Sequence, residues 1–369
     1  MVLKVLDLRN SKPLFSIGVT TYDRVELLLE TLSSITAQDF SDFEVIVGND
    51  NPDRVLNAET LGIDDARITF VNHPVNMGEL DNMNFLLEAS RGRYFTWLAD
   101  DDLYAPNLLS AVYEVLRKND YPDCVFTSFS DFRESLAPEA QVLTSEQFRS
   151  LSGPDFLRSY LNDELKAIGV MGFFDTTYLK QLGGLEDVSE DGFGFYCEYM
   201  ILVRSALLQR IPYIDAPLVY YRVHPGAWGI TNSNLEQYDR AGENLIKRSA
   251  QILLLPGLKG DFSLNLRQLL KRVLGQYVNV ARRTETFHFH NLLAYFIHAR
   301  KYISVFRGTG YYMGGLIALI RAEVWLLSVL CKQKFLAVAP NSLIKLAYSS
   351  RSALHRSKLS NSTPTQNPV

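Results

Sequence analysis

Short apolar runs alternate with amphipathic stretches through the first half of the chain. Five runs rich in β-branched and aromatic residues cover 14–20, 43–48, 67–71, 93–99 and 124–129. Stretches with the apolar spacing of a helix cover 24–37, 79–90 and 105–117. This alternation predicts a mainly parallel sheet with crossover helices.

The pattern changes after residue 130. Residues 130–153 are polar and weakly periodic, which predicts a variable loop region. A glycine-rich segment at 182–194 then precedes a predicted helix at 195–209 and a predicted pair of strands within 211–229. From about residue 240 the spacing is mostly helical, with breaks at 256–257, 308–315 and 340.

Charge divides the chain in nearly the same place. Residues 1–240 contain 19 Lys and Arg against 37 Asp and Glu, whereas residues 241–369 contain 18 against 4. We therefore predict a domain over 1–235, a basic and mostly helical module over 236–356, and a disordered tail over 357–369, which is rich in Ser, Thr, Asn and Pro. The alternative interpretation of the acidic and basic halves is that they form two oppositely charged faces that dock on each other.

One apolar run, residues 308–331, has the length of a membrane span. Arg321 and Glu323 lie near its middle, and each costs roughly 2.5 to 3.5 kcal/mol at the centre of a bilayer, so we do not expect a span. A helix in the membrane interface and a helix buried in a subdomain both remain open. The basic surroundings favour an anionic membrane over nucleic acid, since no nucleic-acid module is recognisable.

The cysteines and the first residues favour a cytoplasmic location. Three widely separated cysteines, Cys124, Cys197 and Cys331, predict neither a disulfide framework nor a zinc site. Three charged residues interrupt the first nine positions, which is not typical of a secretory signal peptide. We expect a cytoplasmic protein, peripheral at the inner face of the plasma membrane.

Three consecutive carboxylates are the strongest chemical signal. Asp100, Asp101 and Asp102 follow an apolar run and precede a turn that ends at Pro106. Mg²⁺ and Mn²⁺ prefer oxygen ligands and bridge carboxylates to nucleotide phosphates, so a divalent cation would offset this charge. The alternative is a solvated turn that caps the following helix.

Three motifs accompany the acid run in a fixed order. They are FSIGVTTYDR at 15–24, EVIVGNDNPD at 44–53, and the stretch from NMGELDNMN to LADDD at 76–102. Together they resemble the nucleotide-sugar-binding half of the family 2 glycosyltransferases, over about residues 14–230. The resemblance implies a GT-A-like mixed α/β sheet flanked by helices and followed by the helical module. It also implies a metal-dependent transfer, with inversion, from a UDP-, GDP- or dTDP-linked sugar; a retaining variant stays open.

The resemblance also implies residue roles at the donor site. The positions that match nucleotide-sugar-binding residues are Thr20, Tyr22, Asp50, Asn84 and Asp100. Asp101 matches the metal-binding acid, and Asp102 is a neighbour without a certain role. Without the family pattern, Thr20 and Tyr22 would be strand-end packing residues, and Asp50 would belong to an Asx turn.

A second set of matches concerns the acceptor. The segment FYCEYMILVRSA at 195–206 resembles the family's catalytic-base segment, an acidic pair followed six residues after its second member by Arg. Glu198 takes the second place, and Cys197 replaces the first acid. A carboxylate there can remove the proton of an acceptor hydroxyl. The alternatives are a solvated glutamate at 198 and a base at Asp191 or Glu190.

The motif YYRVHPGAWG at 220–229 resembles the family's closing segment, in which His224 would bind the metal or the diphosphate. Arg222 is expected on the same strand face. The acceptor we expect is a glycan or glycolipid of a bacterial surface polysaccharide pathway. Two other functions stay open: a non-catalytic nucleotide-sugar-binding or membrane-docking protein, and a nucleotidyltransferase, which matches less well because it would need a glycine-rich phosphate loop.

Overall fold

A mixed sheet forms the centre of the molecule. The computed structural model describes residues 12–227, 231, 234–284, 297, 299–307 and 312–338, with side chains as far as 332, so the tail predicted at 357–369 lies outside the described residues. Within this part, nine strands make one sheet in the order β3-β2-β1-β4-β8-β6-β9-β5, and β7 pairs with β9. The bounds of the strands are Phe15–Thr21 (β1), Phe43–Asn49 (β2), Ile68–Asn72 (β3), Tyr94–Ala99 (β4), Leu103–Tyr104 (β5), Cys124–Phe132 (β6), Phe148–Leu151 (β7), Phe173–Asp175 (β8) and Ile211–Arg222 (β9).

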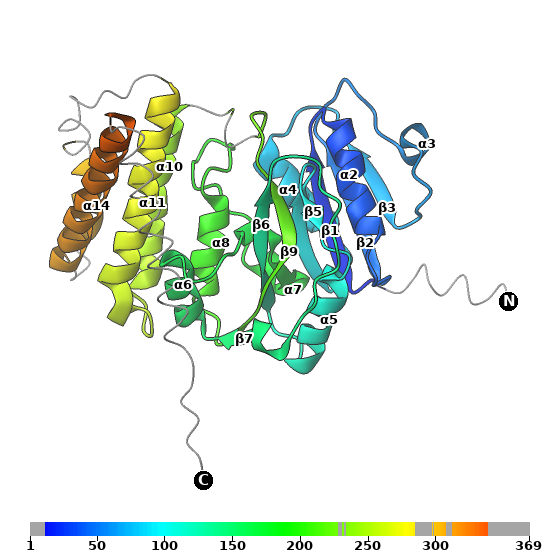
Figure 1. The fold of residues 1–369 in the computed structure, drawn as a ribbon, viewed down its shortest axis with the longest axis horizontal. Coiled ribbons are helices and arrows are strands. Elements are labelled where there is room, and N and C mark those ends of the chain that lie inside the picture. Colours follow the sequence, from blue (N-terminus) through cyan, green and yellow to red (C-terminus); the bar gives the residue numbers. More distant parts are fainter. Residues whose placement is uncertain are drawn as a thin grey trace, which may run out of the picture.

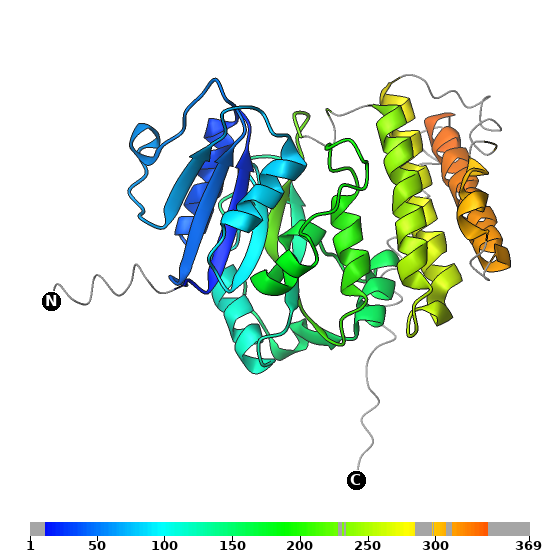
Figure 2. The same cartoon turned by 180° about the vertical axis from the view of Figure 1, so that it is seen from behind.

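The first four strands form a parallel half of the sheet. Strand β1 lies between β2 and β4, with Val19 opposite both Val47 and Leu98. Strands β1 and β2 are buried along their whole length, so their apolar residues serve both faces. Helix α2 (Val25–Thr36) covers one face and α4 (Glu79–Ala89) the other (Figures 1 and 2). The predicted GT-A-like mixed α/β fold is confirmed.

The second half of the sheet differs from the prediction in two places. Residues 211–222 are one strand, β9, and not a pair, and Asp215 and Ala216 form a bulge where β9 pairs with β6. The region 130–153 is not a loop throughout, since it contains the end of β6, a 3₁₀ turn (Ser145–Gln147) and β7. Short strands with mixed polarity give little periodic signal.

Helices fill the spaces around the sheet and form its far end. The shorter ones are α3 (Ala58–Leu61), α5 (Leu108–Lys118), α6 (Gly153–Leu161), α7 (Thr176–Gln181), α8 (Cys197–Ser205) and α13 (Tyr302–Phe306). The long ones, α10 (Leu235–Leu253), α11 (Phe262–Arg283) and α14 (Tyr312–Val338), stand side by side beyond α8 (Figure 1). The helical character predicted from about residue 240 is therefore confirmed for the described residues.

The long helices share a core with the sheet. Leu245 of α10 and Leu266 of α11 belong to the same buried apolar cluster as Trp97 and Phe126 of the sheet. The division between 235 and 236 stays a prediction, although α10 begins at Leu235.

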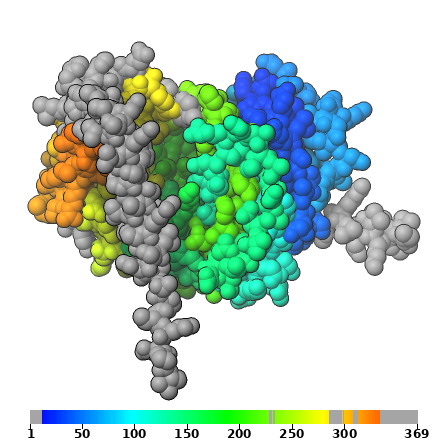
Figure 3. All heavy atoms as spheres, viewed as in Figure 1, coloured from blue at the N-terminus to red at the C-terminus, as the bar shows by residue number. Residues whose placement is uncertain are grey.

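Helix α14 forms the outer edge of the molecule, drawn orange in Figure 3. Residues 312–332 are long and apolar enough to cross a membrane by length and composition. Glu323 in its middle is 7% exposed and pairs with Arg300, with 2.6 Å between Oε1 and Nη1. One side of α14 packs on α11, and the other side is exposed.

Candidate functional site

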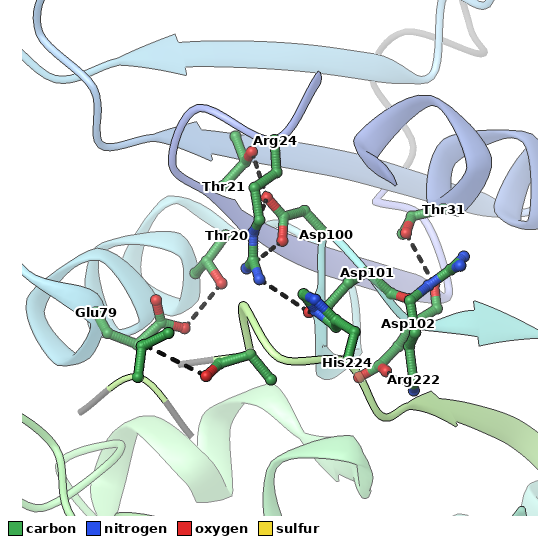
Figure 4. A network of polar contacts seen from close by, with 12 residues as sticks. Thr20, Thr21, Arg24, Thr31, Glu79, Asp100, Asp101, Asp102, Arg222 and His224 are labelled. Atoms are coloured by element: carbon green, nitrogen blue, oxygen red, sulfur yellow. Dashed lines mark hydrogen bonds and ion pairs between the residues drawn. The ribbon is translucent and has the colours of Figure 1, made fainter. Parts of the chain in front are cut away.

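Polar side chains converge where β1, β4 and β9 end (Figure 4). The acid run follows β4, and Asp100 and Asp102 are fully buried, while Asp101 is 7% exposed. The parallel register of β1 and β4 places Thr20 opposite Ala99, so the residues that follow each strand meet. Thr21 Oγ1 donates a hydrogen bond of 2.6 Å to Asp100 Oδ2. This edge of the sheet, which we call the acidic edge, thus buries the three carboxylates of Asp100, Asp101 and Asp102 in a small volume.

Three cationic or basic side chains surround Asp101. Arg24 forms ion pairs with Asp100 and with Asp101, the latter at 2.9 Å between Nη1 and Oδ2. His224 Nε2 lies 2.9 Å from the same Asp101 oxygen. Arg222 Nε donates to the backbone carbonyl of Asp101 at 2.8 Å. Residues 24, 101 and 224, far apart in the sequence, are therefore in direct contact.

Asp102 is hydrogen-bonded to β9 and to α2. Its Oδ1 accepts a hydrogen bond of 2.7 Å from the backbone amide of Arg222, and its carbonyl accepts one of 2.8 Å from Thr31. Its other carboxylate oxygen is buried without a hydrogen-bond partner among the described residues. Burial, and then the neighbouring Asp101, raise the pKa of Asp102 well above its ordinary value. Asp102 therefore joins the acid run to the end of β9.

Glu79 belongs to the same cluster, although the sequence did not single it out. Thr20 Oγ1 donates to Glu79 Oε1 at 2.9 Å. Burial raises the pKa of Glu79 to about 7, and the hydrogen bond from Thr20 opposes that shift. Burial likewise raises the pKa of Asp100 to about 6, against the opposing effect of Arg24. Glu79 is the first residue of α4, where an acid ordinarily stabilises the start of a helix. This common role explains Glu79 in the sequence without a functional site.

The loop before α4 is fastened by Asp50. Its two carboxylate oxygens accept hydrogen bonds from the amides of Met77 (2.7 Å) and Gly78 (2.9 Å). Gly78 has a φ of 86°, a conformation that strongly favours glycine. Tyr22, just after β1, has 52% of its surface exposed. Asp50 thus fixes the loop that leads to Glu79, and Tyr22 is open to solvent.

Asn84 has a different environment from the one expected. Its Nδ2 donates to the carbonyl of Leu185, and its Oδ1 accepts from the amide of Leu185, both at 2.9 Å. Its amide therefore fastens the glycine-rich segment to α4. The nucleotide-sugar-binding role of Asn84 stays a prediction, and it would require this pair of hydrogen bonds to open.

Glu198 lies in the first turn of α8, which starts after a left-handed Tyr196. Burial raises the pKa of Glu198, and Arg272 of α11 opposes the shift. Burial is the largest of the causes that raise the pKa of Tyr221 to about 12. The charges of Asp102, Glu198 and Asp101 contribute to the same shift. Glu198 is therefore close enough to the acidic edge to influence the same side chain. A carboxylate with a raised pKa is a better proton acceptor.

Asp191 and Glu190, the alternatives to Glu198 as the base, are held in ion pairs. Arg240 of α10 binds Asp191, and Arg248 binds Glu190 at 2.7 Å. Burial would raise the pKa of Asp191, but hydrogen bonds from Ser189 and Arg240 outweigh it and lower the pKa. A carboxylate held in this way is a weaker base than Glu198.

Comparisons with known proteins agree with this geometry. The sequence profile described as glycosyl transferase family 2 matches residues 16–176. Residues 16–176, less than half of the chain, are therefore similar to a family 2 glycosyltransferase domain. The match contains Thr20, Asp50 and the acid run, and it ends before Glu198 and His224.

Curated relatives of the family 2 domain are bacterial. A putative colanic acid biosynthesis glycosyl transferase, WcaA of Escherichia coli K12, is 31% identical over 102 residues, which is 27% of this chain and 37% of that protein. A GalNAc(5)-diNAcBac-PP-undecaprenol β-1,3-glucosyltransferase of Campylobacter jejuni is 30% identical over 159 residues, 42% of this chain and 51% of that protein. The chain thus spans between about a third and a half of the length of these two relatives.

Among solved structures, S. aureus TarS 1-349 in complex with UDP-GlcNAc has a TM-score of 0.59 at 14% identity. The likeness covers 85% of this chain and 91% of that one. It extends beyond the family 2 domain into the C-terminal helices, and it concerns the fold alone.

The residues at the acidic edge fit a divalent cation. Among the described residues, no group of three or more His, Cys, Asp and Glu side chains is arranged to hold a metal by itself. Asp101 Oδ2 and His224 Nε2 are nevertheless 2.9 Å apart. Two adjacent ligands of an octahedral ion, each at about 2.1 Å, are roughly 3 Å apart. The chain can therefore offer two ligands of one ion and leave the others to phosphate oxygens and water.

Proposed function

We propose that this protein transfers a glycosyl group from a nucleoside diphosphate sugar to a hydroxyl of a glycan or glycolipid acceptor in bacterial surface polysaccharide or glycolipid biosynthesis. The observation that carries the proposal is the convergence of Asp100 and Asp101, which follow β4 within the family 2 match, with His224, which follows β9. The complex of TarS with UDP-GlcNAc supports a nucleotide-sugar donor for this fold.

In the proposed mechanism, the ends of β1 and β2 bind the nucleotide. Thr20, Tyr22 and Asp50 line the base and ribose, and Asp100 accepts a hydrogen bond from a ribose hydroxyl. Glu198 takes the proton from the acceptor hydroxyl as its oxygen attacks the anomeric carbon on the face opposite the diphosphate, so that the configuration inverts. The nucleoside diphosphate is the leaving group, and the proton stays on Glu198 until solvent removes it.

Asp101 and His224 hold a Mg²⁺ or Mn²⁺ ion in this proposal. When bound, the ion neutralises charge on the departing diphosphate. Arg24 now binds the same Asp101 oxygen as His224, so Arg24 would compete with the ion for this carboxylate. Arg24 then faces the diphosphate as a second positive charge.

The decisive experiment is donor binding and hydrolysis with UDP-, GDP- and dTDP-sugars, with and without Mn²⁺. We expect one donor base to bind, and binding to require the metal and to be lost in Asp101→Ala. Glu198→Gln should keep donor binding and lose turnover. Glu114→Gln, which breaks an exposed ion pair on α5, is the control and should behave as wild type. Absence of binding by every donor under every condition would overturn the proposal.

A second candidate function is a nucleotide-sugar-binding protein without catalysis. The observation that favours it is Cys197 in the place of the first acid of the base motif. Burial raises the pKa of the Cys197 thiol, so it stays neutral and cannot substitute for a carboxylate. Metal-dependent donor binding without hydrolysis or transfer to any acceptor would favour this candidate.

We also propose that α14 rests on the anionic inner face of the plasma membrane. Five apolar side chains form one exposed stripe on this helix, with 37% to 62% of their surface exposed: Met313, Ile317, Ile320, Val324 and Leu327. A continuous apolar stripe of this kind marks an interaction surface.

The charges around the stripe favour lipid over a second copy of the chain. Arg321 and Lys332 are exposed beside it, and Lys271 Nζ lies 5.4 Å from the ring centre of Trp325. Residues 241–369 contain 18 Lys and Arg against 4 Asp and Glu, so two such modules would repel each other. An anionic leaflet instead attracts Lys and Arg by about 1 kcal/mol each.

Vesicle flotation tests this proposal. The protein should float with vesicles of phosphatidylcholine and phosphatidylglycerol, less with phosphatidylcholine alone, and Val324→Glu should abolish flotation. Val142→Glu is the control, because Val142 is 88% exposed elsewhere on the surface. A dimer in solution that Val324→Glu dissociates, together with no flotation of the wild type, would assign the stripe to a second copy and overturn the membrane proposal.

A further inference from the structure

The loop between α7 and α8 has an unusual backbone. Glu190 (φ 60°) and Tyr196 (φ 61°) adopt left-handed conformations without being glycine, and four glycines of the same loop also have positive φ: Gly183, Gly184, Gly192 and Gly194. A left-handed non-glycine residue is strained and persists only where its surroundings impose it. Something must therefore hold this loop in place.

Helix α10 holds it from one side. Three residues spaced by four, and so on one face of the helix, contact the loop. Arg240 donates from Nε to the carbonyl of Ser189 at 3.1 Å, Asn244 from Nδ2 to that of Val188 at 3.0 Å, and Arg248 from Nη1 to that of Asp187 at 3.2 Å. These three residues form what we call the α10 ladder. Helix α10, which carries the ladder, lies beside the loop in both views of the fold (Figures 1 and 2).

The two arginines of the α10 ladder also bind loop carboxylates. Arg240 pairs with Asp191, and Arg248 pairs with Glu186 and Glu190. Glu186 is shared, because its other oxygen pairs with Arg204 of α8. One carboxylate thus joins the helix that carries Glu198 to the helix that carries the ladder.

The fastened loop leads directly to the reacting groups. Residues 192–196 join the ladder's contacts to the first turn of α8, which contains Glu198. A Cβ placed on Gly78 would lie 3.7 Å from the carbonyl of Gly192, and one on Gly194 would lie 3.3 Å from Leu80 Cβ. The loop therefore touches the start of α4 on the donor side and leads to Glu198 on the acceptor side.

We infer that Arg240, Asn244 and Arg248 are positioning residues, which set the place of Glu198 relative to the donor by fixing residues 186–191. This inference rests on the proposed function of Glu198 as the base. It assigns the C-terminal helices a part in the reaction in addition to their proposed contact with lipid. A displacement of about 1 Å in a catalytic group lowers a rate on the order of 100-fold.

Kinetics of Arg248→Gln and Arg240→Asp test the inference. We expect kcat to fall 10- to 100-fold in each, with the donor dissociation constant within about twofold of wild type. Arg240→Asp combined with Asp191→Arg restores the ion pair in reverse and should recover most of kcat. Arg248→Lys keeps one donor group and should fall between wild type and Arg248→Gln.

A matched control separates positioning from stability. Arg158 of α6 pairs with Asp261, which lies next to α11, so Arg158→Gln also breaks an ion pair between the sheet region and the helices, without touching the loop. It should lower the melting temperature as much as Arg248→Gln does and leave kcat unchanged. Equal loss of kcat in both variants, or wild-type kcat in Arg248→Gln, would overturn the inference.

Hydrogen exchange gives a readout that does not need activity. In Arg248→Gln, amides of residues 186–196 should exchange faster than in wild type, whereas Arg158→Gln should leave them unchanged. If wild type binds donor but transfers nothing, the proposed function fails while this measurement still decides whether the ladder orders the loop. Unchanged exchange in Arg248→Gln would contradict the ladder itself.

Discussion

Two regions of the site are built by different means: the acidic edge, which we call the donor edge because the proposed donor binds there, and the loop before Glu198. At the donor edge, parallel strands in register place Thr21 against Asp100, and the protein backbone determines the geometry. The loop before Glu198 has left-handed turns and depends on side chains of α10 that come about 50 residues later. The metal and nucleotide would therefore meet a rigid surface, whereas the acceptor would meet one whose shape depends on ion pairs.

The largest expected effect isolates the loop side from the donor edge. Glu198→Gln removes the proton acceptor without changing the size of the side chain, and we expect kcat to fall on the order of 10² to 10⁴-fold. The donor dissociation constant, measured by calorimetry, should stay unchanged because no strand end is altered. A parallel loss of donor binding would show that the two regions are not separable.

A smaller effect concerns rigidity at the donor edge. Thr21→Val removes the hydroxyl that donates to buried Asp100, and leaving a buried acceptor short of a partner costs about 1 to 3 kcal/mol. Chemical denaturation measures that loss of unfolding free energy. Thr36→Val is the control, because its hydroxyl bonds an exposed helix carbonyl, and it should change little.

The conformation of Gly78 offers a still smaller test. Gly78→Ala introduces a side chain at a φ of 86°, and we expect a loss of about 1 kcal/mol of stability. Its Cβ would meet only the Gly192 carbonyl, at 3.7 Å, so strain and not collision is the cause. Gly260→Ala, with open space around it, is the comparison and should be near neutral. An equal loss in both variants would exclude backbone strain at Gly78 as the reason.

A further expected effect is a dependence on pH. The folded-state pKa values of Glu79 (about 7) and Asp100 (about 6) lie above their ordinary values of 4.5 and 3.8. Groups with raised pKa values stabilise the fold below the ordinary values, and that contribution is lost as pH rises through 6 to 7. The melting temperature without ligand should therefore decline between pH 5 and pH 8, and Glu79→Gln should flatten the decline. An identical slope in Glu79→Gln would contradict the assignment.

Regular elements were predictable, and long-range contacts were not. Five apolar runs correctly predicted β1, β2, β3, β4 and β6, and the signal is clearest for β1 and β2, which are buried along their whole length. The single strand β9, which has a bulge at Asp215, was predicted as a pair of strands. Glu79 was overlooked because an acid at a helix start has an ordinary explanation. Arg240 and Arg248 act on residues 49 to 62 positions away, and no local pattern records such a pairing.

Strand β9 also decides when the protein can finish folding during synthesis. It lies between β6 and β5, yet it is the last strand of the sheet to leave the ribosome. The backbone amide of Arg222 donates a hydrogen bond to the Asp102 carboxylate, and Arg222 follows Asp102 by 120 residues. Until then the nascent chain carries an Asp102 carboxylate without its hydrogen-bond donor and a sheet with an open edge, a state prone to association. We therefore expect the acidic edge to close late, as the final strand inserts into a sheet that is already formed.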